Sequence, residues 1–371
     1  MEIMVAFNQI YKNKKVLITG HTGFKGSWLT NWLLNLGSSI VGYSKNIPSE
    51  PSLFEILNLK SQIRNIIGDI NDYKFLSTIY KTEKPDYIFH LAAQPIVSLS
   101  KSDPTETIKT NAIGTMNLLE VLRIENFNCI TVFVTSDKSY DNIESVWGYR
   151  ENDQLGGKDI YSGSKGAAEL IIKSYFHTFF LKNKSKIRIA VGRAGNVIGG
   201  GDWAKDRLIP DIFKSWSRNK LVTIRNPIAT RPWQHVLEPL SGYLRLGQIL
   251  SKSSRFSGNA YNFGPYSHQI KNVGDLLNDL SQKWKFKNNE NNFYYKKNSK
   301  LSESTILKLN CDKALSHLNW VPNLNYQETI DFVSDWYVNY YKGDIDMSKF
   351  TNSQLNEYIN IAKKNKIPWL N

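Results

Sequence analysis

The sequence is poor in cysteine and has no long apolar run. Among its 371 residues only Cys129 and Cys311 are cysteines, too few for the disulfide framework of a small secreted protein. No stretch approaches the roughly 18 consecutive apolar residues that a membrane-spanning helix needs. Polar residues interrupt the N-terminal stretch 1–15, so we expect no export signal. These absences predict a protein of the reducing cytoplasm that acts without a membrane.

Metal-binding and hydrolytic signatures are also missing. No His, Cys and Asp residues show metal-ligand spacing, and no Ser/His/Asp signature of a hydrolase is present, so no metal is predicted. The 41% of hydrophobic residues can bury a large core, which excludes disorder. A formal net charge of +14 suggests anionic partners, but the lysines are scattered along the chain. We therefore expect a solvated, lysine-rich surface and no nucleic acid partner. The alternative use of this charge is a basic funnel that steers a nucleotide-bearing substrate.

The central feature of the sequence is a glycine segment between a predicted strand and a predicted helix. The apolar run 16–19 leads into Gly20, Gly23 and Gly26, which the amphipathic stretch 27–36 follows. Glycines there let the backbone approach a pyrophosphate, and the N-terminal end of the helix stabilises its charge. Because the spacing alone recurs by chance, its position between strand and helix is what favours a dinucleotide site.

Strand and helix patterns alternate from this segment to about residue 192. Such alternation predicts parallel strands joined by right-handed crossovers, that is, an α/β fold with a doubly wound parallel (Rossmann) sheet. Residues 1–192 are predicted to form this dinucleotide-binding domain, with a return segment near 227–265. The less regular part, 193–371, is predicted to be mainly a smaller C-terminal substrate-binding lobe with C-terminal helices.

Small and polar residues stand where the predicted strands end. Thr19, Asp69, Ala92 and Thr135 occupy such ends, and doubly wound sheets bind ligands beyond the carboxyl ends of their strands. Asp69 can accept a hydrogen bond from an adenine amino group, or it can cap a loop. The second strand ends in Ser-Lys at 44–45 rather than in the carboxylate that often holds a ribose hydroxyl of NAD. At this point NAD and NADP both stay open.

A tyrosine and a lysine four residues apart are the candidates for redox chemistry. Tyr161 and Lys165 share one face of a predicted helix, where the ammonium can lower the pKa of the phenol from its usual value of about 10. A phenol so tuned can take a hydroxyl proton while hydride leaves the same carbon for a nicotinamide. The spacing also occurs at 11–15 and 80–84, but those pairs lack a position near the predicted cleft.

Six longer segments follow one another in order. They are Gly20-His-Thr-Gly-Phe-Lys-Gly26, His90-Leu-Ala-Ala-Gln-Pro95, Thr135-Ser-Asp-Lys138, Trp147-Gly-Tyr-Arg-Glu151, Arg193-Ala-Gly-Asn-Val-Ile-Gly-Gly-Gly-Asp-Trp203 and Arg231-Pro-Trp-Gln-His-Val236. With Asn111 and the pair Tyr161 and Lys165, nearly the whole chain resembles the extended short-chain dehydrogenase/reductase family. More narrowly, the six segments resemble the CDP-glucose 4,6-dehydratases.

The resemblance implies an internal redox cycle on a nucleotide sugar, in which NAD oxidises C4 of the glucose, water is lost across C5 and C6, and the hydride returns to C6. Tyr161 would be the base for the C4 hydroxyl, with Ser136 as its hydrogen-bonding aid and Lys165 as organiser of the ribose and phenol. Asp137 would protonate the departing C6 hydroxyl, and Lys138 would remove the C5 proton. Related dTDP-glucose dehydratases carry Glu at that last position. A lysine base must be neutral, and an ion pair with a carboxylate is its alternative role.

Binding positions also follow from the resemblance. It assigns to the cofactor Gly20, Gly23, Phe24, Gly26, Asp69, Ile70, Ala92, Ala93, Tyr161 and Lys165. It assigns to the substrate Gln94, Asn196, Arg207 and Arg231. The amide and guanidinium groups of this second set can meet a diphosphate or make structural contacts instead, whereas His235 is expected to serve packing or orientation.

The same resemblance implies a homodimer joined through helices near 104–124 and 161–182. It also implies a place in deoxysugar biosynthesis, as for a lipopolysaccharide O-antigen. Two alternatives within enzymes are an NDP-sugar 4-epimerase, which needs no acid and base for C5 and C6, and a 4,6-dehydratase of another nucleotide sugar. A catalytically silent nucleotide-binding or nucleic-acid-binding protein is the alternative from another class.

Overall fold

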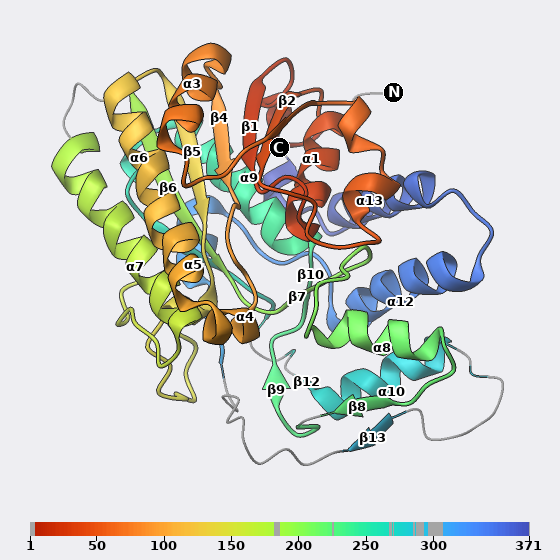
Figure 1. The fold of residues 1–371 in the computed structure, drawn as a ribbon. Helices are drawn as coiled ribbons and strands as arrows, with labels where there is room; N and C mark the ends of the chain where they lie inside the picture. Colours follow the sequence, from red (N-terminus) through yellow and green to blue (C-terminus); the bar gives the residue numbers. More distant parts are fainter. Residues whose placement is uncertain are drawn as a thin grey trace.

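A parallel sheet of seven strands forms the centre of the structure, which is a computed structural model (Figure 1). The structure describes residues 4–370 except 182–185, 225, 267–268, 270, 285, 287–292 and 296–306. Within this part of the chain the strands of the sheet are β1 (Lys15–Thr19), β2 (Ser39–Ser44), β3 (Arg64–Ile67), β4 (Tyr87–His90), β5 (Cys129–Val134), β6 (Ile187–Ala194) and β11 (Ala260–Phe263).

The strand order in this sheet is β11-β6-β5-β4-β1-β2-β3, and every neighbouring pair is parallel. The order reverses between β1 and β4, because the chain runs outward from β1 to β3 and then crosses back to β4. A reversal of this kind opens a crevice at the carboxyl ends of the two central strands. The predicted doubly wound parallel sheet is thereby confirmed.

Helices cover both faces of the sheet. Their bounds are α1 (Phe24–Asn35), α2 (Leu53–Ile56), α3 (Tyr73–Glu83), α4 (Val97–Ser102), α5 (Pro104–Ile108), α6 (Gly114–Glu125), α7 (Ile160–Tyr175), α8 (Leu208–Trp216), α9 (Leu237–Lys252), α10 (Val273–Trp284), α11 (Asp312–Leu318), α12 (Tyr326–Lys342) and α13 (Met347–Lys364). Buried side chains of α3, α6 and α7 form one core, and those of α1, α9, α12 and α13 contribute to the other. Figure 1 shows α6 and α7 side by side on the first of these faces.

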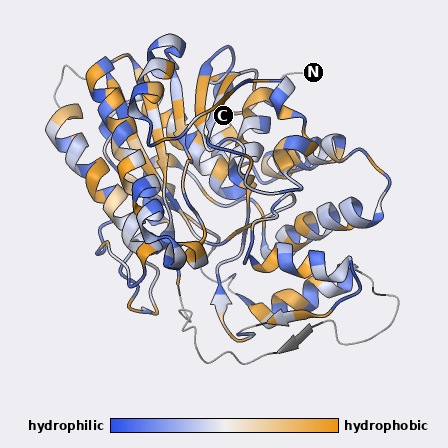
Figure 2. Ribbon diagram, viewed as in Figure 1, coloured by the Kyte–Doolittle hydropathy of each residue, from blue (hydrophilic) through white to orange (hydrophobic). Residues whose placement is uncertain are grey.

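Alternation along the strands explains why the sheet has two cores. Side chains of successive strand residues point to opposite faces, so Val16 and Ile18 of β1 belong to the core with α1 and α9, whereas Leu17 belongs to the core with α3 and α6. Figure 2 shows the central strands as largely hydrophobic, while the surrounding helices mix hydrophobic and hydrophilic residues. That mixture is typical of helices that bury one side against a sheet.

A smaller lobe lies beside the carboxyl ends of the strands (Figure 1). Short strand pairs mark it: β7 (Val197–Ile198) with β10 (Gln234–His235), β9 (Thr230–Arg231) with β12 (Lys271–Asn272), and β8 (Val222–Ile224) with β13 (Phe293–Tyr295). Aromatic rings join its helices, since Phe213 of α8 stacks on Tyr337 of α12 with ring centroids 4.4 Å apart. Between α8 and α10 the chain returns to the sheet, where α9 packs on β5 and β6 and β11 extends the edge.

Two features are absent from the described part of the chain. None of the helices there combines the length and apolarity that crossing a membrane requires. No group of three or more His, Cys, Asp or Glu side chains among these residues could hold a metal ion.

Candidate active site

The glycine segment forms a tight turn between β1 and α1. Gly20 has φ +77°, and a Cβ on it would come within 2.7 Å of the backbone nitrogen of Ala92. A Cβ on Gly26 would collide with the Gly20 carbonyl oxygen. No side chain caps the N-terminus of α1 at Gly23, and no acidic residue occupies its first turn. This uncapped helix end, beyond the carboxyl end of β1, fits the pyrophosphate of a dinucleotide.

The predicted adenine end of the site lies beyond β2 and β3. Asp69 follows β3, and its Oδ1 accepts a hydrogen bond of 2.9 Å from the backbone N–H of Asn71. Its other oxygen is 2.9 Å from Nζ of Lys45, which also lies 3.1 Å from Glu106. Ile70 is buried against Gly114 of α6. The lysine after β2 is therefore neutralised by two carboxylates.

The acid predicted for the C6 hydroxyl lies at the carboxyl end of β5. Ser136 donates a 2.9 Å hydrogen bond to Oδ1 of Asp137 and accepts one of 3.2 Å from the backbone N–H of Lys138. Only 3% of Asp137 is exposed. Burial raises the pKa of its carboxyl, against lowering by Lys138, Ser136 and Lys25. The pKa is thus shifted in the direction that a proton donor requires.

The lysine that follows this acid is the residue predicted to take the C5 proton. Lys138 is partly buried, and its ammonium makes no hydrogen bond or ion pair with the residues that the structure describes. The charge of Lys138 nevertheless lowers the pKa of Asp137, so an ion pair with a carboxylate remains the alternative role of this lysine.

Tyr161 and Lys165 lie one turn apart on α7, and each is only 7% exposed. Burial raises the pKa of Tyr161 to about 12, although Ser136 and Arg207 lower it. Burial lowers the pKa of Lys165 to about 8, against the opposing charge of Glu169. The net shift of the phenol pKa is thus opposite in sign to the lowering that the sequence predicts, because desolvation outweighs the effects of Ser136 and Arg207.

The four predicted substrate residues differ in their surroundings. Arg207 lies before α8, 3.4 Å from Asp202, and is close enough to Tyr161 to lower its pKa. The side-chain amide of Gln94 is held in its own loop, since it donates to Thr107 and Ile96. Arg231 on β9 donates to the neighbouring carbonyl of Thr230. The fourth, Asn196, lies between β6 and β7, and its carbonyl accepts from Gln234.

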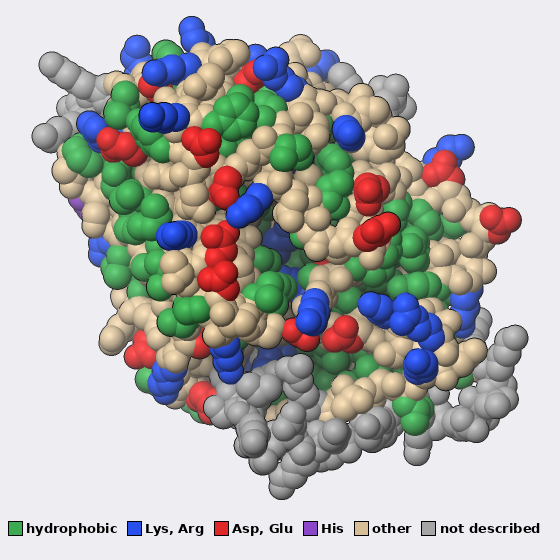
Figure 3. All heavy atoms as spheres, in the orientation of Figure 1, with side chains coloured by type: hydrophobic (Ala, Val, Ile, Leu, Met, Phe, Trp, Pro, Cys, Tyr) green, Lys and Arg blue, Asp and Glu red, His purple; other side chains and the backbone are tan. Residues whose placement is uncertain are grey.

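Figure 3 shows a hollow between the sheet and the smaller lobe, with Lys and Arg side chains inside it. Lys25, in the first turn of α1, is a charged residue of this region that the sequence interpretation did not assign. The charges of Asp137, Lys165 and Arg207 shift the pKa of Lys25, so its ammonium lies near these groups. The sequence could have indicated Lys25, because it stands inside the glycine motif between Phe24 and Gly26.

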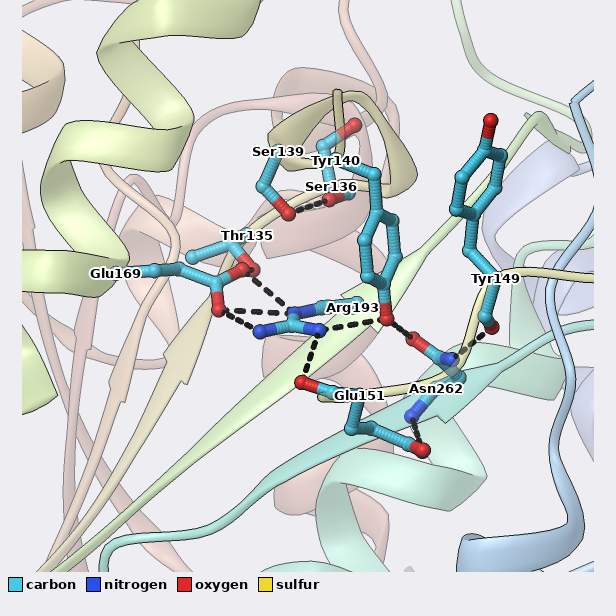
Figure 4. A network of polar contacts seen from close by, with 9 residues as sticks. All are labelled: Thr135, Ser136, Ser139, Tyr140, Tyr149, Glu151, Glu169, Arg193 and Asn262. Carbon is cyan, nitrogen blue, oxygen red and sulfur yellow. Dashed lines mark hydrogen bonds and ion pairs between the residues drawn. The ribbon is translucent and has the colours of Figure 1, made fainter. Parts of the chain in front are cut away.

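A buried ion pair lies beside Thr135 at the carboxyl end of β5 (Figure 4). Arg193 of β6 donates through Nε to both carboxylate oxygens of Glu169 on α7, at 2.9 and 2.8 Å, and a second contact joins its Nη2 to Oε2. Thr135 donates to Oε1 of the same carboxylate at 2.6 Å. Both charged side chains are 3% exposed. This pair ties α7 to the ends of β5 and β6.

The network continues from Arg193 toward the loop before α7. Arg193 donates through Nη1 to the Tyr140 hydroxyl at 2.6 Å and to the Glu151 carbonyl at 3.2 Å. Tyr140 in turn donates to Asn262 of β11 at 2.8 Å, and Asn262 donates its backbone N–H to the Glu151 carboxylate (Figure 4). The sequence interpretation missed this network. In the sequence, the charged Arg193 within an apolar strand is the feature that could have indicated this network.

Comparisons with known proteins agree with this geometry. The family model described as GDP-mannose 4,6 dehydratase matches residues 17–332. A CDP-glucose 4,6-dehydratase from Salmonella typhimurium is 43% identical over 359 residues, which are 95% of this chain and 98% of that protein. A CDP-paratose 2-epimerase from Salmonella typhi is 26% identical, covering 87% of this chain and 98% of that one. A solved structure of dTDP-glucose 4,6-dehydratase from Bacillus anthracis in complex with NAD is 21% identical in sequence. Its TM-score is 0.72, and the match covers 87% of this chain and 96% of that chain. This similarity shows the fold.

Removing one member of the buried ion pair should strongly destabilise the protein. We expect Glu169→Leu to lower the free energy of unfolding by about 3–5 kcal/mol, because the Arg193 guanidinium would stay buried without its counter-ion. The double variant Glu169→Leu, Arg193→Met should recover a large part of this loss. Urea unfolding followed by circular dichroism measures both.

The control is Arg123→Met, which breaks the half-exposed pair with Glu120 on α6 and should cost no more than about 1 kcal/mol. If Glu169→Leu costs as little as this control, the ion pair does not have the stabilising role described.

Proposed function

The chain belongs to the GDP-mannose 4,6-dehydratase family, whose model matches residues 17–332, and from this premise we propose that it converts CDP-glucose to CDP-4-keto-6-deoxyglucose. The observation that carries the reaction type is the buried acid Asp137, hydrogen-bonded to Ser136 beside Tyr161. The choice of nucleotide sugar rests on the 43% identity to the Salmonella typhimurium enzyme.

NAD is the cofactor that this site fits. The turn at Gly20, Gly23 and Gly26 would hold its pyrophosphate at the N-terminus of α1. The 2′-phosphate of NADP would meet the carboxylates of Asp69 and Glu106, which already neutralise the lysine after β2. When bound, NAD accepts the hydride from C4 of the sugar and later returns it to C6.

The first step needs a group that takes the proton of the C4 hydroxyl. Tyr161 has that role here, with the Ser136 hydroxyl beside its phenol. Both Ser136 and Arg207 lower the pKa of the phenol and oppose the effect of burial. Lys165, one turn further along α7, orients the ribose and keeps a positive charge on this side of the helix when protonated.

The second step removes water across C5 and C6. The C4 ketone makes the C5 proton more acidic, and the Lys138 amine takes it. The electron pair of the C5–H bond forms the C5–C6 double bond, the C6–O bond breaks, and the leaving oxygen takes the proton of Asp137. An epimerase needs neither group, so the buried acid at the end of β5 favours the dehydratase.

A panel of CDP-, dTDP-, UDP- and GDP-glucose tests this function. We expect the highest kcat/KM with CDP-glucose and a product lighter than the substrate by one water, measured by mass spectrometry. The cofactor should leave the cycle oxidised, so reduced nicotinamide should not accumulate in stoichiometric amounts. A product that keeps its C6 hydroxyl would identify an epimerase, and a preference for another nucleotide would correct the substrate.

Lys138→Met separates oxidation from elimination, because methionine keeps much of the side-chain length without the amine. We expect nicotinamide absorbance to rise on addition of CDP-glucose and elimination to slow by about 10²–10⁴-fold. Exchange of the C5 hydrogen with deuterated water should fall in parallel. The exposed Lys158→Met is the matched control and should behave as the wild type.

Two other outcomes of this experiment would contradict the assignment. Elimination at the wild-type rate would give the role of base to another group. Failure to oxidise C4 would mean that Lys138 acts in binding or in the first step.

We also propose a homodimer joined through α5, α6 and α7, placed in the cytoplasm and in deoxysugar biosynthesis such as that of an O-antigen. Large apolar side chains are exposed on these helices and on the short π-helical segments next to them, namely Ile108, Ile113, Ile160, Leu170 and Phe179. Since α5 and α7 pack on each other, these side chains can form one face that a second copy covers. The cysteines are unpaired, as a reducing compartment favours.

Light scattering should therefore give the mass of two chains, and Leu170→Asp should shift it toward one. Leu170 is 53% exposed on α7, so an aspartate there would be buried and uncompensated in the dimer. Leu315→Asp, at an equally exposed leucine of α11, is the control. A single-chain mass for the wild type would contradict the dimer.

A further inference from the structure

Lys25 is a charged residue of the site without an assigned role. It is partly buried in the first turn of α1, and its ammonium makes no hydrogen bond or ion pair with the described residues. A partly buried cation without a protein partner is costly. The reaction described above uses the turn that contains Lys25 but not the side chain itself.

The segment 195–203 connects the helix of Lys25 to the acid Asp137. Trp28, one turn along α1 from Lys25, donates from Nε1 to the Gly200 carbonyl at 2.9 Å. A Cβ on Gly199 would lie 3.1 Å from the Phe24 ring, and a Cβ on Gly195 would lie 3.0 Å from Oδ2 of Asp137. The first turn of α1 and the Asp137 carboxyl therefore pack against the same segment.

The charges around Lys25 point to this carboxyl rather than to the phenol. Burial lowers the pKa of Lys25 to about 7, with Arg207 and Lys165 adding to the shift and Asp137 and Asp202 opposing it. The groups that shift the pKa of Asp137 include Lys138, Ser136 and Lys25. The charges that act on the Tyr161 phenol are instead those of Arg207, Asp137 and Asp159. The charge of Asp137 also raises the pKa of Tyr161 and of the buried Tyr243.

We propose that Lys25 is a positioning residue for the elimination step, whose ammonium stabilises the carboxylate that Asp137 becomes after it gives its proton to the leaving C6 oxygen. This inference rests on the function proposed above. No proton moves to or from Lys25 in the step: the proton of Asp137 leaves with the water, and the C5 proton goes to Lys138. The ammonium thus makes Asp137 a stronger acid.

The test compares Lys25→Met with Lys25→Arg, which keeps a cation. The first readout needs neither cofactor nor substrate. The infrared band of the protonated Asp137 carboxyl, assigned by its loss in Asp137→Asn, is titrated with pH. Removal of the cation should raise the titration midpoint of Asp137 in Lys25→Met, and Lys25→Arg should restore it toward the wild type. Lys158→Met is the matched surface control.

The second readout follows the two halves of the reaction. In Lys25→Met we expect the calorimetric Kd for NAD and the rise of nicotinamide absorbance with CDP-glucose to match the wild type. Elimination should slow on the order of 10-fold, because Asp137 is a weaker acid, and Lys25→Arg should recover part of this rate. A melting curve for each variant shows that the protein is folded.

The outcomes separate this inference from the proposed function. An unchanged titration midpoint of Asp137 would overturn the role of Lys25. A raised Kd for NAD or substrate with normal elimination would also overturn it and would make Lys25 a phosphate contact. If the wild type does not dehydrate CDP-glucose, the proposed function fails, and with it the role in elimination. A shifted Asp137 midpoint would then support only the electrostatic contact between the two groups.

Discussion

The buried ion pair between Glu169 and Arg193 fixes the geometry on which the candidate chemistry depends. Its carboxylate lies one helical turn beyond Lys165 on α7, and its guanidinium belongs to β6. Because Thr135 also binds this carboxylate, the pair joins the helix that bears the tyrosine to the strand end that bears the acid. Away from water, neither charge can be left unpaired without large cost. The ion pair thus holds α7 and the carboxyl end of β5 together at the candidate site.

Burial also sets the protonation states on the open side of this pair. It raises the pKa of Asp137 and Tyr161 and lowers that of Lys165, so one physical cause favours the neutral form of each group. A neutral aspartic acid can donate a proton, whereas a neutral tyrosine must first lose one. In the proposed reaction the same burial therefore helps elimination and hinders oxidation. Cations close to the phenol, such as Arg207, offset part of this hindrance.

The sequence predicted the sheet and the glycine turn because both depend on short segments. Alternation of strand and helix patterns indicated parallel pairing, and Gly20 and Gly26 stand where a Cβ would meet backbone. The network of Arg193, Tyr140 and Asn262 could not be predicted, because its members lie far apart in the chain and meet only when β6 and β11 pair. The sign of the Tyr161 shift was wrong for a related reason, since spacing shows a nearby lysine but not the depth of burial.

The loop after β6 decides which charges meet above the strand ends. A side chain at Gly195 would crowd Oδ2 of Asp137, so the glycine makes room for this carboxyl. Gly199 likewise makes room for the ring of Phe24. The same loop carries Asp202, whose carboxylate lies 3.4 Å from Arg207. A change in this loop would therefore alter the acid, the first turn of α1 and the arginine together.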